Sequence, residues 1–220
     1  MLHELREYPT ADDVTSAAAD YVAEFARRTV AEKGRFDFAV SGGRTPWTMF
    51  ERLAIMDVTW SDVVIYQVDE RIAPVGDATR NLTNLEHSLG QLRPTIVAMP
   101  VNEENLDAAA AAYAQLLPTR FDLVHLGLGP DGHTASLIPG DPVLAVKDHL
   151  VAVTGIYQGE QRMTLTYEAL GRADQLLWLV TGSDKRTALA ALLESDRSIP
   201  AGSVEAAGSL VMADASALSS

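Results

Sequence analysis

Short apolar runs alternate with longer helical segments along almost the whole 220-residue chain. The predicted strands cover residues 36–40, 62–68, 95–99, 121–125, 150–153, 163–166, 175–180 and 209–213. The predicted helices cover residues 10–33, 82–90, 103–117 and 184–194, with a further helix beginning at about Pro46. Because most of the strands are apolar almost throughout, we expect them to be buried on both faces. That pattern is typical of an α/β fold with a mainly parallel sheet between layers of helices.

The N-terminal helix has recognisable ends in the sequence. Thr10 and Asp13 form a capping box, and Gly34 follows the helical pattern. No internal repeat, low-complexity tract or linker rich in proline and serine interrupts the alternation. The sequence therefore predicts a single domain over residues 1–220, and a chain of this length buries roughly 70% of its unfolded surface.

The charge and the residue composition argue against several classes of function. The formal net charge of −13 argues against a nucleic-acid or anionic-membrane partner, because phosphate backbones are bound by basic surfaces. An anionic small molecule would need Arg and Lys side chains placed at its own site. The chain has no cysteine, which excludes disulfides, thiol catalysis and cysteine-bound metal.

The expected location and partners follow from what the sequence lacks. The first ten residues are charged and have no apolar signal-peptide core, and no run of about 18 apolar residues follows. We therefore expect a cytoplasmic protein that does not span a membrane. No segment of the sequence indicates an obligate protein partner.

Four of the predicted strands end in polar, loop-forming residues. These strand ends are residues 41–45, 69–71, 127–133 and 181–185. Ligands of parallel α/β sheets bind at the carboxyl ends of the strands. If the four strands are neighbours, their loops share one edge of the sheet, and this edge is the predicted binding site.

Two of these loops have the composition of anion-binding sites. The SGGRTP segment supplies two hydroxyls, two glycine N–H groups and one guanidinium at a helix start, from Ser41, Gly42, Gly43, Arg44 and Thr45. The TGSDK segment places Lys185 in the first turn of another helix, where a cation is unfavourable unless an anion binds there. An ordinary tight turn and a solvated surface lysine would give the same patterns, so both interpretations stay open.

Asp69, Glu70 and Arg71 follow a buried strand directly. Alternation along the chain sends Asp69 and Arg71 to one side and Glu70 to the other. Asp69 is a candidate to orient a substrate hydroxyl or to act as a base, and Arg71 to hold a phosphate or a developing oxyanion. The alternative is a cluster of salt bridges at the sheet edge.

The stretch LGLGPDGHTASLIPG, residues 126–140, gathers glycines and prolines around Asp131 and His133. Its first residues match the GxGxxG pattern of a dinucleotide site, but that pattern should open a long crossover helix. Here only one predicted helical turn fits before Pro139, so we reject a dinucleotide cofactor. His133 lies at the start of that turn and is the candidate catalytic residue, because an imidazole titrates near neutral pH.

The other histidines have no comparable surroundings. His125 lies inside a predicted strand and is expected to be a core residue with its hydrogen bonds satisfied. No two histidines have a metal-ligand spacing such as HxxxH, so the sequence predicts neither a metal site nor a cofactor.

Taken in order, these motifs resemble the 6-phosphogluconolactonase family. The resemblance is carried by SGGRTP, VDER with Asn81 after it, LGLGPDGHTASLIPG, the segment that begins at Arg162, and TGSDK. It covers nearly the whole chain and implies a three-layer α/β/α domain with a modified Rossmann arrangement. The family belongs to a larger group that includes glucosamine-6-phosphate deaminase.

The resemblance also implies a reaction and its residues. The reaction is hydrolysis of 6-phospho-D-glucono-1,5-lactone to 6-phosphogluconate in the oxidative pentose phosphate pathway, so the expected partner is a phosphorylated sugar lactone. His133 matches the base that activates water, Asp131 is a candidate to orient it or the water, and Asp69 is matched to sugar hydroxyls. The positions matched to binding of the substrate or its phosphate are Ser41, Gly42, Gly43, Arg44, Thr45, Arg71, Asn81, Arg162 and Lys185.

The sequence departs from the family pattern at two positions. Arg80 stands where serine often precedes Asn81, and Ile138 stands where phenylalanine is common. Both departures concern the sugar contacts rather than the class of reaction.

Two other functions compete with the lactonase. A glucosamine-6-phosphate deaminase resembles this chain up to the DGH motif but continues with a glutamate that assists ring opening. Residues 134–139, TASLIP, contain no carboxylate, which favours hydrolysis. A non-catalytic sugar-phosphate sensor fused to a DNA-binding module would need a basic patch, and nothing before residue 34 supplies one.

Overall fold

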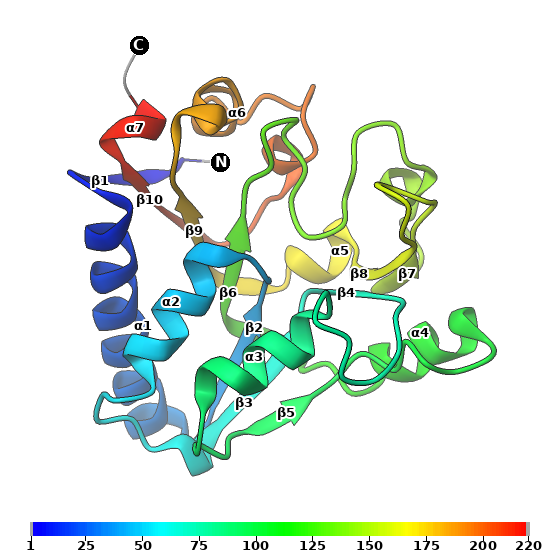
Figure 1. The fold of residues 1–220 in the computed structure, drawn as a ribbon, viewed down its shortest axis with the longest axis horizontal. Coiled ribbons are helices and arrows are strands. Elements are labelled where there is room, and N and C mark those ends of the chain that lie inside the picture. The colour runs from blue at the N-terminus through cyan, green and yellow to red at the C-terminus, as the bar shows by residue number, and fades with distance from the viewer. Residues whose placement is uncertain (1, 219–220) are drawn as a thin grey trace.

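A seven-stranded, fully parallel sheet forms the centre of the fold in the computed structural model, which describes residues 2–218 (Figure 1). The strand order is β1-β10-β9-β6-β2-β3-β5. The strands are β1 (Glu4–Tyr8), β2 (Phe36–Val40), β3 (Val63–Gln67), β5 (Thr95–Val97), β6 (Phe121–Gly127), β9 (Ala173–Val180) and β10 (Gly208–Asp214). The predicted parallel α/β sheet is confirmed, and β2, β6 and β9, which end in three of the polar loops, are neighbours.

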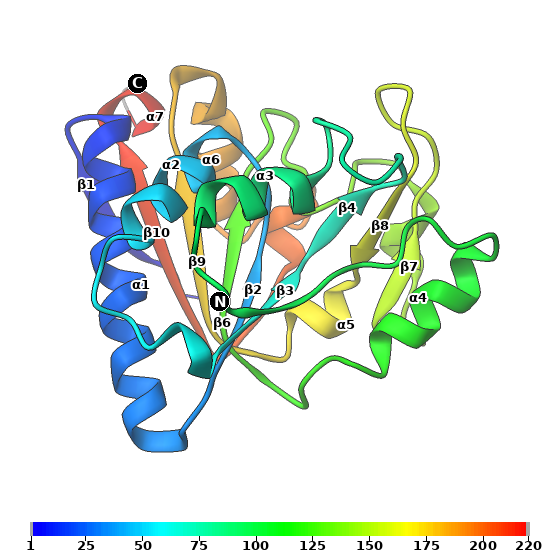
Figure 2. The ribbon, with the colours of Figure 1, turned by 60° about the horizontal axis from the view of Figure 1, so that its bottom comes forward.

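Helices cover both faces of this sheet, as the three-layer arrangement requires (Figure 2). One face packs against α1 (Ala11–Lys33), α2 (Arg44–Leu53) and α3 (Asn81–Leu89). The other packs against α4 (Leu106–Ala114), α5 (Tyr167–Leu170), α6 (Arg186–Leu193) and α7 (Ala215–Leu218). Alternation along β3 explains the division, since Val63 and Ile65 join the first core and Val64 and Tyr66 the second.

A separate three-stranded antiparallel sheet lies beside the main one, in the order β4-β8-β7. Its strands are β4 (Asp69–Arg71), β8 (Arg162–Leu165) and β7 (Val151–Val153). The alternation of strands and helices in the sequence does not reveal that these segments form a second sheet. Val68 joins the two sheets, because its N–H donates to Val40 O at 3.0 Å and its own carbonyl accepts from Leu165 N at 2.7 Å.

The N-terminal segment holds one element that the sequence pattern does not reveal. β1 reads ELREY and is largely exposed, so it lacks the apolar pattern of a buried strand. It is a strand because its backbone pairs in parallel with β10 at the edge of the sheet. The next element follows its signals: Thr10 and Asp13 form the capping box of α1, and Gly34 ends that helix with φ 74°.

His125 on β6 is fully buried in the centre of the main sheet. Its Nδ1 accepts from the backbone N of Ser41 at 3.3 Å, but its Nε2 has no partner among the described residues. The core position is confirmed, and the expectation that both ring nitrogens are satisfied is wrong. Burial lowers the pKa of His125 to about 3.

This buried imidazole should make the free energy of unfolding depend on pH. The folded-state pKa lies below the unfolded value of 6.5, so the full contribution exists above about pH 6.5 and is lost as the pH falls toward 3. Between pH 7.5 and pH 5 we expect His125 to remove about 2 kcal/mol of stability. Urea denaturation at both pH values should show a smaller loss in His125→Asn. The exposed His87→Asn is the control, and an unchanged loss in His125→Asn would contradict the assignment.

Candidate active site

One cavity of about 640 Å³ opens at the carboxyl ends of the central strands. It is lined by the loop after β2, by β4, by the start of α3, by the loop after β6, and by residues next to β8 and α6. Ten of the residues predicted from the sequence line it: Ser41, Gly42, Gly43, Arg44, Asp69, Arg71, Asn81, His133, Arg162 and Lys185. Six separate stretches of the sequence therefore meet at one place.

Two predicted residues do not line this cavity. The Thr45 hydroxyl lies 3.0 Å from the Thr181 hydroxyl and lines a neighbouring hollow, so its assignment to the substrate site stays a prediction. Asp131 lies behind His133 and contacts its ring rather than the cavity.

Asp131 and His133 form a close pair. Asp131 Oδ1 lies 2.5 Å from His133 Nδ1 and also accepts from the His133 backbone N at 3.2 Å. Partial burial alone would raise the pKa of Asp131, but hydrogen bonds from His133 and Tyr157 hold that pKa below its usual value. An ionised Asp131 makes Nδ1 the donor, which leaves Nε2 of His133 as the basic nitrogen. Nε2 makes no hydrogen bond with the described residues.

Gly129 makes this close pair possible. A Cβ atom at Gly129 would lie 2.1 Å from His133 Nδ1 and 2.6 Å from Asp131 Oδ1. The loop is closed by the Gly129 N–H, which donates to His133 O at 2.8 Å. The turn after His133 is not the predicted helical turn. Instead, Thr134 and Leu137 bridge across a tight turn.

Asp69 forms part of the cavity wall from β4. Its Oδ2 accepts from the Ser136 hydroxyl at 2.7 Å, and its Oδ1 accepts from Asn81 Nδ2 at 3.3 Å. Burial raises the pKa of Asp69 by more than the Ser136 hydrogen bond and the charge of Arg162 lower it. Asp69 therefore holds its proton to a higher pH than an ordinary aspartate.

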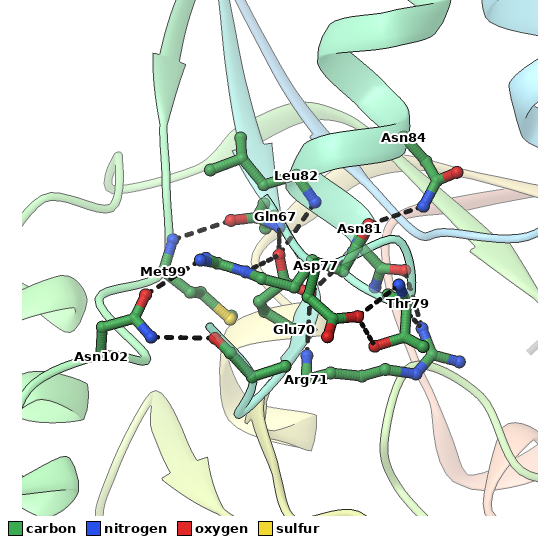
Figure 3. Close-up of polar contacts among 12 residues, drawn as sticks. Gln67, Glu70, Arg71, Asp77, Thr79, Asn81, Leu82, Asn84, Met99 and Asn102 are labelled. Carbon is green, nitrogen blue, oxygen red and sulfur yellow. Dashed lines mark hydrogen bonds and ion pairs between the residues drawn. The ribbon is translucent and has the colours of Figure 1, made fainter. Parts of the chain in front are cut away.

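Glu70 does not line the cavity, and its side chain organises the residues around it (Figure 3). Its fully buried carboxylate accepts hydrogen bonds from Gln67 Nε2, Arg80 Nε and the backbone N–H groups of Arg71, Asn81 and Leu82. The last two belong to the first turn of α3, so Glu70 caps that helix. The predicted alternation is confirmed, and Arg80 is a buried partner of Glu70 rather than a sugar contact.

Two arginines extend the cavity wall, and Glu160 links them. Arg71 Nε donates to Glu160 Oε2 at 2.8 Å and its Nη1 donates to Thr79 O at 2.7 Å. Arg162 Nη2 lies 3.6 Å from the same Glu160 oxygen, and Arg162 Nε is buried without a partner among the described residues. A buried guanidinium N–H without an acceptor favours an anion in the cavity.

The glycine loop after β2 completes the polar wall. Gly42 has no room for a side chain, since a Cβ atom there would lie 2.0 Å from Asn81 Oδ1. Gly43 has φ 135° and is the N-cap residue of α2, and the buried Ser41 hydroxyl has no partner within residues 2–218. Lys185 lines the same cavity and pairs with Asp184 at 3.1 Å.

Sequence reasoning missed several residues of the site. Those that line the cavity include Trp47, Thr79, Gln158 and Glu160, and Tyr157 contacts Asp131 and His133 from outside the lining. Gly155 and Gly159 signal a turn in this segment, but nothing in the sequence indicates that the turn reaches His133.

No group of three or more His, Asp or Glu side chains is placed to hold a metal ion in the part of the chain that the structure describes. Within residues 2–218, no helix combines the length and the apolar character needed to cross a membrane.

The sequence matches one known family over most of its length. Residues 9–212 match the family described as glucosamine-6-phosphate isomerases/6-phosphogluconolactonase. A relative from Caulobacter vibrioides named 6-phosphogluconolactonase is 32% identical over 219 residues, which cover 88% of this chain and 94% of the relative. One of the same name from Mesorhizobium japonicum is 36% identical over 193 residues, which cover 82% and 81%.

The fold also matches a solved structure over almost the whole chain. The crystal structure of a 6-phosphogluconolactonase from Shewanella baltica superposes with a TM-score of 0.89 at 25% identity, covering 97% of this chain and 98% of that chain. Every residue that lines the cavity falls within the matched residues 9–212.

Proposed function

The chain belongs to the glucosamine-6-phosphate isomerase/6-phosphogluconolactonase family, in which it is an enzyme of the lactonase branch, and we propose that His133 activates the water that hydrolyses 6-phospho-D-glucono-1,5-lactone. The product is 6-phospho-D-gluconate. One observation supports this proposal most directly: a single cavity is lined by the His133 ring, held from behind by Asp131, and by the cationic side chains of Arg162 and Lys185.

The proposed reaction needs one base and a set of hydrogen-bond donors. Nε2 of His133 takes a proton from water, and the water oxygen bonds to the lactone carbonyl carbon. The carbonyl oxygen becomes an oxyanion, which Arg71 or loop N–H groups stabilise. The bond between that carbon and the ring oxygen then breaks, and the imidazolium returns its proton to the ring oxygen. Asp131 stabilises the transient imidazolium and keeps its Nδ1 proton in place.

The proposed phosphate site lies among Arg162, Lys185 and the N–H groups of Gly42 and Gly43. Arg44 lines the same cavity. These groups offset the unfavourable charge of an anion near a chain with a net charge of −13. Asp69 and Asn81 line the same cavity and are proposed to contact the sugar hydroxyls.

The segment after His133 distinguishes hydrolysis from deamination. The Thr134 hydroxyl donates to Gly127 O, the Ser136 hydroxyl donates to Asp69, and Leu137 is buried. Only Ala135 of this turn lines the cavity, so the turn brings no carboxylate to the substrate. The glutamate that a deaminase carries in this segment therefore has no counterpart in this turn.

Removing a cation from the proposed phosphate site should weaken binding of the phosphorylated lactone. Lys185→Ala and Arg162→Ala are expected to raise KM for it about tenfold to a hundredfold, because a charge-assisted hydrogen bond contributes about 1.5–3 kcal/mol. Steady-state kinetics with phosphorylated and unphosphorylated gluconolactone measure the effect. Arg186→Ala is the control, since Arg186 is exposed and bonds Ser216 O. Equal losses with both lactones would refute the phosphate assignment.

Three further properties of the protein stay predictions from the sequence. We propose that a single domain carries the activity, that the protein acts in the cytoplasm, and that it needs no obligate protein partner. Gel filtration of active enzyme and fractionation of the source cells test them.

A further inference from the structure

A tight turn between β7 and β8 brings Tyr157 to the catalytic pair. Tyr157 and Glu160 exchange two backbone hydrogen bonds, of 2.9 and 3.1 Å. Gln158 and Gly159 at the tip have φ values of 53° and 82°. The antiparallel pairing of β8 with both β4 and β7 anchors the base of this turn.

The Tyr157 side chain makes three separate contacts at the site. Its hydroxyl donates to Asp131 Oδ2 at 3.1 Å. Its ring meets the His133 ring edge to face, with centroids 5.8 Å apart and planes at 66°. Arg162 Cζ lies 5.4 Å from the centre of the Tyr157 ring, which fixes the ring from another side.

These contacts divide the Asp131 carboxylate between two partners. Oδ1 contacts His133 and Oδ2 contacts Tyr157. Asp131 is part-exposed in a loop, and its short side chain has no other side-chain partner in the described chain. Without the phenol, only water would fix Oδ2, so the carboxylate would stay beside the imidazole but would no longer hold the ring in one orientation.

We propose that Tyr157 is a positioning residue, whose hydroxyl fixes the Asp131 carboxylate so that Asp131 holds the His133 ring in the orientation that accepts a proton from water. This inference rests on the proposed role of His133 as the base. Tyr157 acts through Asp131 and does not itself exchange a proton with the substrate.

The direction of the effect follows from the charges around the pair. A hydroxyl that donates to a carboxylate makes that carboxylate a weaker acceptor, so Asp131 favours the imidazolium less strongly with Tyr157 present. Arg162 faces the Tyr157 ring, and Glu160 faces Arg71 and Arg162. Lys185 lines the same cavity. All four charges stay in place when only the hydroxyl is removed.

The test begins with Tyr157→Phe, which keeps the ring and removes the hydroxyl. We expect kcat for the phosphorylated lactone to fall about threefold to tenfold, with KM changed less than about twofold. The acid limb of the kcat/KM profile should move to higher pH. Ile156→Ala is the matched control, because Ile156 is the neighbouring residue and is 79% exposed. A Tyr157→Phe enzyme with parental kcat and pH profile would overturn the proposal.

A double-mutant cycle shows whether Tyr157 acts through Asp131. In an Asp131→Asn background, Tyr157→Phe should change kcat by less than about 1.5-fold if the pathway is shared. An equal fall in both backgrounds would overturn the proposal, since it would mean that the hydroxyl acts elsewhere.

A spectroscopic measurement separates this inference from the proposed function. The imidazole nitrogens of His133 are titrated by nitrogen-15 NMR, with His133→Gln used for assignment. The midpoint should be higher in Tyr157→Phe than in the parent, whether or not the parent hydrolyses the lactone. An inactive parent with a shifted midpoint would refute the hydrolysis alone, and an unchanged midpoint would refute the role of Tyr157 alone.

Discussion

Replacing His133 with alanine is expected to lower kcat for the phosphorylated lactone about 100- to 10,000-fold, the range typical of a lost general base. The lactone is an activated ester, so the remaining groups still bind it and orient it. The variant should fold, because His133 lies in a loop whose closing hydrogen bond from Gly129 uses only its backbone oxygen.

Two measurements on His133→Ala check this expectation. Stopped assays corrected for spontaneous hydrolysis give kcat, and calorimetry gives the affinity for 6-phosphogluconate, which should stay within about threefold of the parent because the phosphate site is intact. His87→Ala is the control, since that histidine is exposed on α3. Turnover near the parental value would contradict the assignment of the base.

Replacing Glu70 with alanine is expected to lower the free energy of unfolding by about 3–5 kcal/mol, as breaking a buried ion pair usually does. The change leaves Arg80 buried without its carboxylate and frees the N–H groups of Asn81 and Leu82 at the start of α3. Activity should fall too, because Arg71 and Asn81 line the cavity next to Glu70.

Urea denaturation measures the effect of Glu70→Ala. Glu86→Ala is the matched control, because Glu86 is exposed on the same helix and its loss should cost less than about 0.5 kcal/mol. Glu70→Gln keeps an acceptor oxygen, so its free energy of unfolding should lie between those of Glu70→Ala and Glu86→Ala. If Glu70→Ala were as stable as Glu86→Ala, Glu70 would not be the cap of α3.

The sequence predicts the central sheet well because the signals for it are local. Each buried strand is an apolar run, and each polar loop follows its own strand directly. β1 and β4 lack such a signal, because what makes ELREY and DER into strands is pairing with β10 and β8 far along the chain. The same limit explains why the second sheet could not be separated from the first.

The residues of the site also fall into two groups, those that the sequence predicts and those that it does not. The glycine loops, His133 and Lys185 are predicted because their motifs are contiguous. Tyr157 depends on a turn that approaches Asp131 only after β7 and β8 have paired, and no pattern reports that approach. Arg80 is visible in the sequence as a departure from the family pattern, but its role is not. The structure supplies that role, because Arg80 bonds the buried carboxylate of Glu70.

The central claim is that this cavity hydrolyses a phosphorylated sugar lactone rather than deaminating an amino sugar phosphate. The most direct test gives the purified protein freshly made 6-phospho-D-glucono-1,5-lactone and, in parallel, glucosamine 6-phosphate. Acid release from the lactone and ammonia release from the amino sugar are followed, each against a sample without enzyme. We predict acid release far above the spontaneous rate and no ammonia. Ammonia release, with lactone hydrolysis at the spontaneous rate, would contradict the claim.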